Sequence, residues 1–281
     1  MRKILKYLIV LFLLYILLYS ILKVNNKIYE GISNLSEDGF KIIKGVLIDK
    51  EIKELVENSN SLRYNKMKEL ILSNKRLKEE IKYLLGVDYV LHDYIWIIKK
   101  SRIHTCHRDN NGDFFNKGQK KASYTIIIYL EEMGKCLGVI SGSHKRKYSN
   151  SINIENKVEN VLCKKGDMII FNGNLIHVGT ILEKNDNLRI QLKVSHKDDI
   201  KHLSYYENFN KILNKENNMP KSILNMQYNL SCLFPIISDI TQKENIKSAR
   251  GSSDGREISI LQKIYSLLFY SDSSFYDLPN F

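Results

Sequence analysis

Short β-rich segments separated by turn residues dominate the middle of the chain. From Tyr89 onwards the clearest are YVLHDYIWIIK, ASYTIIIYL, CLGVIS, MIIFN and NLRIQLKVS. Turn pairs such as Asn111-Gly112 and Asn172-Gly173 punctuate them, and no helical pattern intervenes. Several short strands joined in this way indicate an antiparallel sandwich or barrel. We therefore predict a β-domain core over residues 88–198.

The segments on either side of this core predict helices. Apolar residues recur at helical spacing between residues 36 and 87, for example at Ile52, Leu55 and Leu77, so we expect a helical layer there. Residues 199–281 give a weaker pattern and are predicted to form a helical C-terminal extension. Its end should be an amphipathic helix, whose apolar face would contain Ile258, Leu261, Ile264 (or Tyr265) and Leu268.

The N-terminal segment MRKILKYLIVLFLLYILLYSILKV contains a long apolar run. At about 1.5 Å per residue, about nineteen helical residues reach about 28 Å, close to the thickness of a thin bilayer. A cleaved signal peptide would also begin this way, but no small-x-small cleavage signal follows. We therefore expect an uncleaved signal anchor, a transmembrane helix, over residues 1–24, with a tether over 25–35.

Flanking charge predicts the orientation of this anchor. Arg2, Lys3 and Lys6 precede the apolar run, whereas only Lys23 and Lys27 follow it closely. Because positive residues favour the cytoplasmic side, the sequence predicts a single-pass type II membrane protein. The remainder of the chain would lie in the lumen of the secretory pathway or outside the cell.

Charge and cysteine content exclude some classes of protein. The formal net charge is +12, from 43 Lys and Arg against 31 Asp and Glu. The lysines are spread along the chain without a basic block or interleaved aromatics, which argues against a nucleic-acid partner. The cysteines share no CxxC spacing, so a zinc ribbon is unsupported. One disulfide remains open among Cys106, Cys136, Cys163 and Cys232.

The stretch HTCHRDNNG carries the first candidate site. On an extended segment residues i and i+2 project to the same side, so His107 and Asp109 can bind one ion from one face. His104 and Cys106 have the opposite parity and are interpreted as scaffold. The pair is weak evidence alone, since His196 and Asp198 form a second one.

Two later residues strengthen the first pair. After further strand patterns, His177 follows the segment MIIFN, and Arg189 lies on the next predicted strand. Two histidines and one carboxylate on a β-scaffold form the facial triad of non-haem Fe(II) oxygenases, which leaves coordination positions open. Arg189 is placed to hold the distal carboxylate of a bidentate oxo-acid, and Gln191 would share its inward face.

Taken in order, these motifs resemble the phytanoyl-CoA dioxygenase family of Fe(II)/2-oxoglutarate-dependent oxygenases. The resemblance covers roughly residues 36–196, through SEDGFKIIKGVLIDKEIKEL, HRD, VISGSHKRK, KKGDMIIFNGNLIHVGT and the arginine of LRIQLKV. It implies a double-stranded β-helix (jelly-roll) core. The expected fold is therefore mainly β with flanking helices, an N-terminal transmembrane helix and a helical C-terminal extension, with an oxygenase-like domain over residues 36–198.

The resemblance also implies the chemistry of the site. His107, Asp109 and His177 would bind Fe(II), and Arg189 would anchor the cosubstrate 2-oxoglutarate, with Gln191 and Thr125 as further candidates for binding it. Ascorbate is a candidate accessory reductant. The expected function is a membrane-anchored dioxygenase that hydroxylates an unidentified small molecule, peptide, lipid or glycan. Two alternatives stay open: a cupin-like metal enzyme that uses no oxo-acid, and a non-catalytic β-domain binding module.

Overall fold

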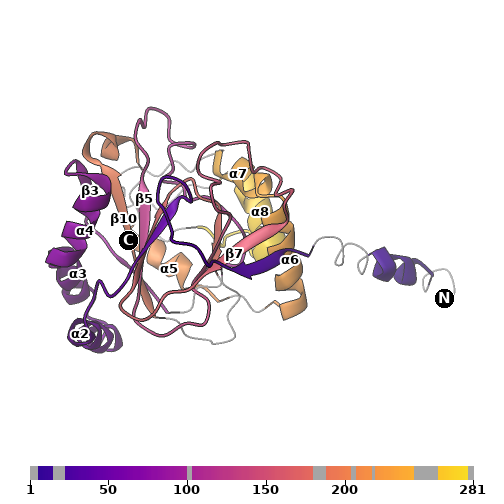
Figure 1. Cartoon of the computed structure of the whole chain (residues 1–281). Helices are drawn as coiled ribbons and strands as arrows, with labels where there is room; N and C mark the ends of the chain where they lie inside the picture. Colours follow the sequence, from indigo (N-terminus) through magenta and orange to yellow (C-terminus); the bar gives the residue numbers. More distant parts are fainter. Residues whose placement is uncertain are drawn as a thin grey trace.

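Two facing β-sheets with helices on either side form the body of the molecule (Figure 1). The computed structural model describes residues 6–14, 23–99, 103–179, 188–203, 207–216, 219–243 and 259–277. Within these ranges the two sheets have six and four strands. The strand segments predicted from the sequence therefore lie in two layers.

The larger sheet has the strand order β2-β8-β5-β10-β3, and β4 also pairs with β10. All of its pairs are antiparallel. Its strands are β2 (Phe40–Ile43), β3 (Tyr89–Leu91), β4 (Trp96–Ile98), β5 (Tyr124–Tyr129), β8 (Met168–Asn172) and β10 (Arg189–His196). The central strands β5, β8 and β10 are buried on both faces, which explains their continuous apolar runs.

Side chains alternate across the larger sheet and thereby build two cores. On β5, Ile126 and Ile128 pack in the cluster that also contains Leu55, Met67 and Leu77 of the helical layer. The intervening Ile127 and Tyr129 face the other sheet. The layer comprises α2 (Asp49–Asn60), α3 (Tyr64–Ser73) and α4 (Lys75–Leu85). One face of the sheet is thus covered by helices, and the other forms one wall of the interior.

The smaller sheet closes the opposite side of that interior. Its order is β1 (Asn25–Ile28), β7 (Lys157–Val161), β6 (Leu137–Val139), β9 (His177–Gly179). The β1–β7 pair is parallel and the others are antiparallel, so this sheet is mixed. Because β9 begins with His177, the first residue of an edge strand carries a predicted metal ligand.

The later helices of the C-terminal extension, within residues 219–277, lie on the side of the sheets away from α2–α4 (Figure 1). Two 3-10 turns, Lys197–His202 and Glu207–Phe209, lead into the helices α5 (Asn210–Leu213), α6 (Lys221–Leu233), α7 (Ile236–Lys243) and α8 (Ile260–Tyr270). On α8 the buried side chains are Gln262, Tyr265, Ser266, Phe269 and Tyr270. The aliphatic face predicted to pack is instead exposed at Leu261, Ile264 and Leu268, while Ile258 lies outside the described residues.

The predicted fold class requires correction. The architecture is a pair of sheets, one of them mixed, with helices packed on both sides, rather than a mainly β domain behind a membrane anchor. In the segment 1–24, residues 6–14 are helical, while residues 1–5 and 15–22 lie outside the described part of the chain. Nine helical residues reach only about 14 Å, against about 30 Å of hydrocarbon.

The predicted membrane anchor is wrong by the same measure. Across the part of the chain that the structure describes, no helix combines the length and the apolar character needed to cross a bilayer. The single-pass type II placement depended on such a helix and is wrong as well. The apolar run was long enough in the sequence, but the helix seen in its described part is too short.

Candidate metal centre

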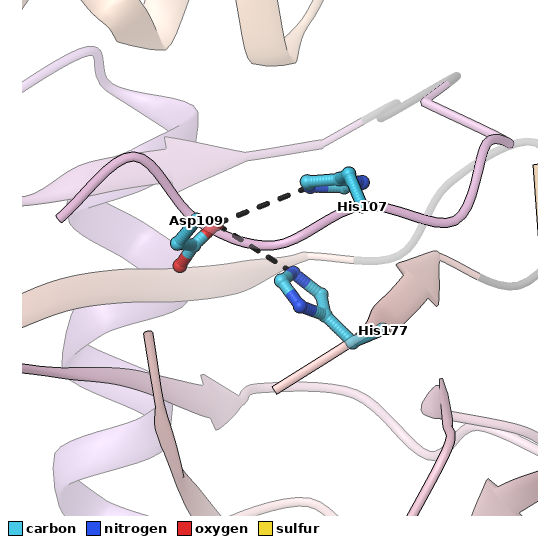
Figure 2. Close-up of side chains that lie close together, drawn as sticks. All are labelled: His107, Asp109 and His177. Atoms are coloured by element: carbon cyan, nitrogen blue, oxygen red, sulfur yellow. Dashed lines mark ion pairs between the residues drawn. The ribbon is translucent and has the colours of Figure 1, made fainter. Parts of the chain in front are cut away.

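Three side chains from two separate segments of the chain converge between the sheets (Figure 2). Asp109 Oδ1 lies 3.6 Å from His177 Nε2 and 3.9 Å from His107 Nε2. One ligand atom from each residue lies within 4.8 Å of the others. His107 and Asp109 come from the segment between β4 and β5, and His177 opens β9. The structure therefore brings together the three residues that the sequence predicted as ligands.

Backbone contacts hold the two histidines in this orientation. His107 and His177 form an isolated antiparallel bridge, in which each N–H donates to the other residue's carbonyl at 2.9 Å. His107 Nδ1 lies 2.8 Å from the carbonyl of Thr105, and His177 Nδ1 lies 2.9 Å from that of Leu175. Since a carbonyl can only accept, each Nδ1 carries the proton, and the lone pair of each Nε2 is directed into the site.

Electrostatics favour the protonation states that metal binding requires. Burial, followed by the neighbouring His107, lowers the pKa of His177 to about 4, although Asp109 opposes the shift. Burial alone would raise the pKa of the Asp109 carboxyl, but Lys193 and the two imidazoles outweigh it and hold that pKa well below its usual range. At neutral pH the site therefore presents a neutral His177 and an ionised Asp109.

Gly112 and Gly173 allow the segment that carries His107 and Asp109 to approach the turn that precedes β9. The Asp109 N–H donates to the Gly173 carbonyl at 2.8 Å. A Cβ on Gly173 would lie 2.9 Å from the backbone nitrogen of Gly112 and 3.0 Å from Asn111 Oδ1. Because such distances are too short for a real side chain, glycine is required where these two loops cross.

The predicted oxo-acid anchor lies on β10 beside the triad. Arg189 and Gln191 both line the cavity that contains the three ligands. Arg189 is paired in register with Tyr129 of β5. The Tyr129 hydroxyl is buried and lacks a hydrogen-bond partner among the described residues. A guanidinium next to an unsatisfied hydroxyl suits a carboxylate, which accepts from both.

Thr125 and Lys193 form a second polar layer behind Asp109. Thr125 Oγ1 donates to Asp109 Oδ2, and Lys193 Nζ lies 2.5 Å from the same oxygen. The sequence interpretation missed Lys193. Its position could have been found by parity, because it follows Arg189 and Gln191 at every second residue of one strand.

The C-terminal extension is joined to the ligand segment residue by residue. His104 Nε2 lies 2.8 Å from Gln227 Oε1, and Thr105 Oγ1 lies 2.8 Å from the Tyr270 hydroxyl. The next residue is linked through a disulfide, Cys106–Cys232. Arg108, fully buried, forms an ion pair with Asp239 of α7. The three residues before His107 and the one between His107 and Asp109 therefore bond to the extension, while the ligands themselves face the cavity.

The same extension forms part of the cavity wall. The triad lines a narrow cavity of about 90 Å³, together with Trp96, Ile103 and Phe171 of the β-domain. Its other wall contains Ser238 and Thr241 of α7, Gln262 and Tyr265 of α8, and Tyr276. This wall is neutral and combines hydroxyl, amide and aromatic groups. The extension is thus part of the site.

The chain carries a domain of a known enzyme family. Residues 65–180 match phytanoyl-CoA dioxygenase (PhyH), a range that contains all three ligands and ends before Arg189. Residues 65–180 therefore match the family that the sequence resembles, and this resemblance is confirmed. The expectation that the chain is an enzyme of this oxygenase kind is confirmed with it. A search of curated protein sequences found no match.

Several solved structures are similar over part of the chain. The epimerase SnoN from nogalamycin biosynthesis, a non-haem α-ketoglutarate-dependent enzyme, is 16% identical over 58% of this chain and 79% of its own, with a TM-score of 0.48. HygX from Streptomyces hygroscopicus, solved with nickel and 2-oxoglutarate, is 14% identical over 58% and 84%, with a TM-score of 0.46. At this level of likeness, the reaction of the present chain must be argued from its own site.

The close approach of Gly112 and Gly173 generates a first prediction. Gly173→Ala should raise the Kd for Mn(II) and lower the free energy of unfolding by about 1–3 kcal/mol, since the methyl group forces the ligand segment away. Gly134→Ala is the control, because a Cβ there meets nothing within 4 Å. Electron paramagnetic resonance measures free Mn(II), and urea unfolding measures stability. If both variants have the same Kd for Mn(II) and the same free energy of unfolding, the close approach at Gly173 is contradicted.

The disulfide generates a second prediction. Cys232→Ser should lower the free energy of unfolding by about 3–5 kcal/mol, because Cys106–Cys232 closes a long loop with a sequence separation of 126. A reductant should destabilise the wild-type protein to a similar extent and leave the Cys232→Ser variant unchanged in the same urea titration. A reductant effect of equal size on both proteins would show that the stabilisation lies elsewhere.

Proposed function

We propose that the chain is an Fe(II)/2-oxoglutarate-dependent oxygenase that hydroxylates a substrate bound against the C-terminal extension. The observation that carries this proposal is the placement of the triad and Arg189 in one cavity. The triad offers a metal site, and Arg189 offers a carboxylate site, with the buried Tyr129 hydroxyl paired to it in register on the neighbouring strand.

The donor set fits a first-row metal ion. Two imidazole nitrogens and one carboxylate oxygen are the facial ligands of non-haem Fe(II) enzymes and leave coordination positions for other ligands. His107, Asp109 and His177 would hold the ion through Nε2, Oδ1 and Nε2. When bound, iron supplies the activation of O₂ that is coupled to decarboxylation of 2-oxoglutarate to succinate. Ascorbate is proposed as the reductant that keeps the iron in its ferrous form.

The chain supplies the position and charge of the cosubstrate. We assign the distal carboxylate of 2-oxoglutarate to Arg189 and Tyr129, because that pair joins a cation to an unsatisfied donor. Gln191, on the same face of β10, can donate to the oxo-acid from its amide. Thr125 is already engaged by Asp109 and Lys193, so we assign its hydroxyl to the ligand carboxylate rather than to the cosubstrate.

The extension supplies the wall that a substrate would contact. Ser238, Thr241 and Gln262 present neutral hydrogen-bonding groups to the cavity, and Tyr265 presents an aromatic ring. These walls also keep bulk water from the metal, which favours oxidation of a bound substrate over loss of oxidant to solvent. We propose that a small molecule or the end of a peptide, lipid or glycan is the substrate.

One enzyme alternative remains, a cupin-like metal-dependent enzyme that uses no oxo-acid. It accounts for the triad but gives no role to Arg189 or to the buried Tyr129 hydroxyl. The non-catalytic binding module is less consistent with the site, because the three ligand atoms lie close enough for one ion. The two enzyme hypotheses therefore differ in the role of Arg189.

Substitution of Arg189 separates these two enzymes. Arg189→Met should raise the Kd for 2-oxoglutarate about tenfold or more, since a hydrogen-bonded charge contributes about 1.5–3 kcal/mol. The Kd for Mn(II) should change by less than about threefold, because Arg189 is not a ligand. Isothermal titration calorimetry of the Mn(II)-loaded protein measures the first value, and electron paramagnetic resonance measures the second.

Arg146→Met is the matched control, because Arg146 is exposed. It should alter neither constant. An unchanged affinity for 2-oxoglutarate in Arg189→Met would favour the enzyme without an oxo-acid.

A further inference from the structure

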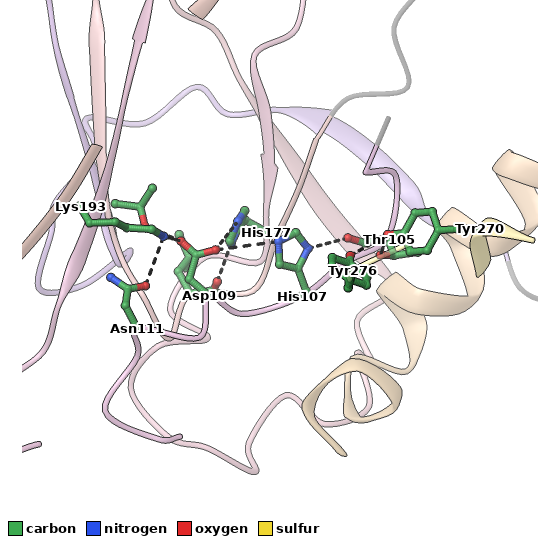
Figure 3. A network of polar contacts seen from close by, with 10 residues as sticks. Thr105, His107, Asp109, Asn111, His177, Lys193, Tyr270 and Tyr276 are labelled. Carbon is green, nitrogen blue, oxygen red and sulfur yellow. Dashed lines mark hydrogen bonds and ion pairs between the residues drawn. The ribbon is translucent and has the colours of Figure 1, made fainter. Parts of the chain in front are cut away.

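Lys193 places a buried ammonium group directly behind a metal ligand (Figure 3). Its Nζ lies 2.5 Å from Asp109 Oδ2, 2.6 Å from Thr125 Oγ1 and 3.3 Å from Asn111 Oδ1. An ammonium group has three N–H donors, and each of these oxygens can accept one. The side chain is only 4% exposed. Lys193 is therefore fully hydrogen-bonded inside the site.

The two oxygens of Asp109 have separate partners. Oδ1 faces the Nε2 atoms of His107 and His177, where a metal ion would bind. Oδ2 accepts from Thr125 and pairs with Lys193 on the opposite side. A metal could bind through Oδ2 as well only if the carboxylate gave up the bond to the ammonium. The geometry therefore favours a carboxylate that binds metal through one oxygen.

Lys193 also changes the charge of the site. It lies on the same face of β10 as Arg189, and the indole ring of Trp96 lies 5.4 Å from its Nζ. A divalent ion with one carboxylate ligand has one net positive charge, to which Lys193 and Arg189 each add one. In a buried site such charges are weakly screened. With all three contributions the site is strongly positive, so the cavity attracts a dianion, such as a dicarboxylate oxo-acid, more strongly than a monoanion.

We propose that Lys193 is a positioning residue that makes the metal centre selective for a dianionic oxo-acid. It holds Asp109 as a one-oxygen ligand, which leaves adjacent coordination positions open for the two oxygen atoms of the oxo-acid. It also adds one positive charge to those of the metal centre and Arg189, which strengthens the attraction for the oxo-acid. This inference rests on the proposed function and adds to it a residue outside the triad and the anchor.

Neutral substitution of Lys193 tests the inference through two opposed effects. In Lys193→Met, Oδ2 is released and the site loses a positive charge. The Kd for 2-oxoglutarate in the Mn(II)-loaded protein should therefore rise about fivefold or more, because the incoming dianion meets one positive charge fewer in a weakly screened site. The Kd for Mn(II) itself should stay the same or fall, because the carboxylate is no longer neutralised. Calorimetry and electron paramagnetic resonance measure these constants.

Two matched variants separate charge from packing. Lys197→Met makes the same change at an exposed lysine directly after β10 and should alter neither constant; this lysine pairs with Asp88. Thr125→Val removes the neutral bond to Asp109 Oδ2 and keeps the ammonium, so it should affect 2-oxoglutarate less than Lys193→Met does. If Lys193→Met does not fold by circular dichroism, Lys193→Gln, which retains a donor without charge, replaces it.

The possible results lead to different conclusions. Weaker 2-oxoglutarate binding with undiminished Mn(II) binding supports the inference. A smaller effect on 2-oxoglutarate, or a parallel loss of Mn(II) and 2-oxoglutarate binding, overturns it, since the latter is what a merely structural role would produce. If the wild-type protein loaded with Mn(II) does not bind 2-oxoglutarate at all, the proposed function fails first, and the role of Lys193 fails with it.

Discussion

The backbone bridge between His107 and His177 is the contact on which the site depends. It ties the segment after β4 to the first residue of β9, so the two imidazoles are brought together by main-chain hydrogen bonds. Asp109 lies two residues after His107 on an extended segment and therefore projects to the same side. Its N–H donates to the Gly173 carbonyl, which fixes its position. Ligands held by backbone in this way are oriented before any ion arrives, which lowers the entropic cost of binding.

Two buried ion pairs flank the bridge between His107 and His177. Asp109 pairs with Lys193 toward the larger sheet, while Arg108, the residue between the ligands, pairs with Asp239 of α7. Burial raises the pKa of Asp239 to about 6, although Arg108 opposes the shift. Removing one partner of such a pair leaves an uncompensated charge, at a cost of about 3–5 kcal/mol. The extension is therefore coupled energetically to the segment that carries His107 and Asp109, and it is also joined to that segment covalently through Cys106–Cys232.

The clustering of the three candidate ligands could be predicted from the sequence because their positions follow simple rules. His107 and Asp109 share a side of an extended segment, and His177 and Arg189 stand next to recognisable strands. The prediction from the sequence failed where the buried side chains are polar. The buried face of α6 contains Gln227, Asn229 and Ser231, which bond to His104, to Val24 and to Cys106, so no apolar period marks that helix. Likewise α8 buries aromatic and polar side chains and exposes its leucines. Lys193 was missed because a lysine is expected at the surface.

The central claim is that the triad and Arg189 form one site in which a metal ion and an oxo-acid bind together. The most direct test is isothermal titration calorimetry of 2-oxoglutarate into the metal-free and the Mn(II)-loaded protein. Binding that is strong only when Mn(II) is present is the predicted result, because two oxygen atoms of the oxo-acid are expected to ligate the ion. Equal affinity in both forms, or no binding to the loaded form, would contradict the account.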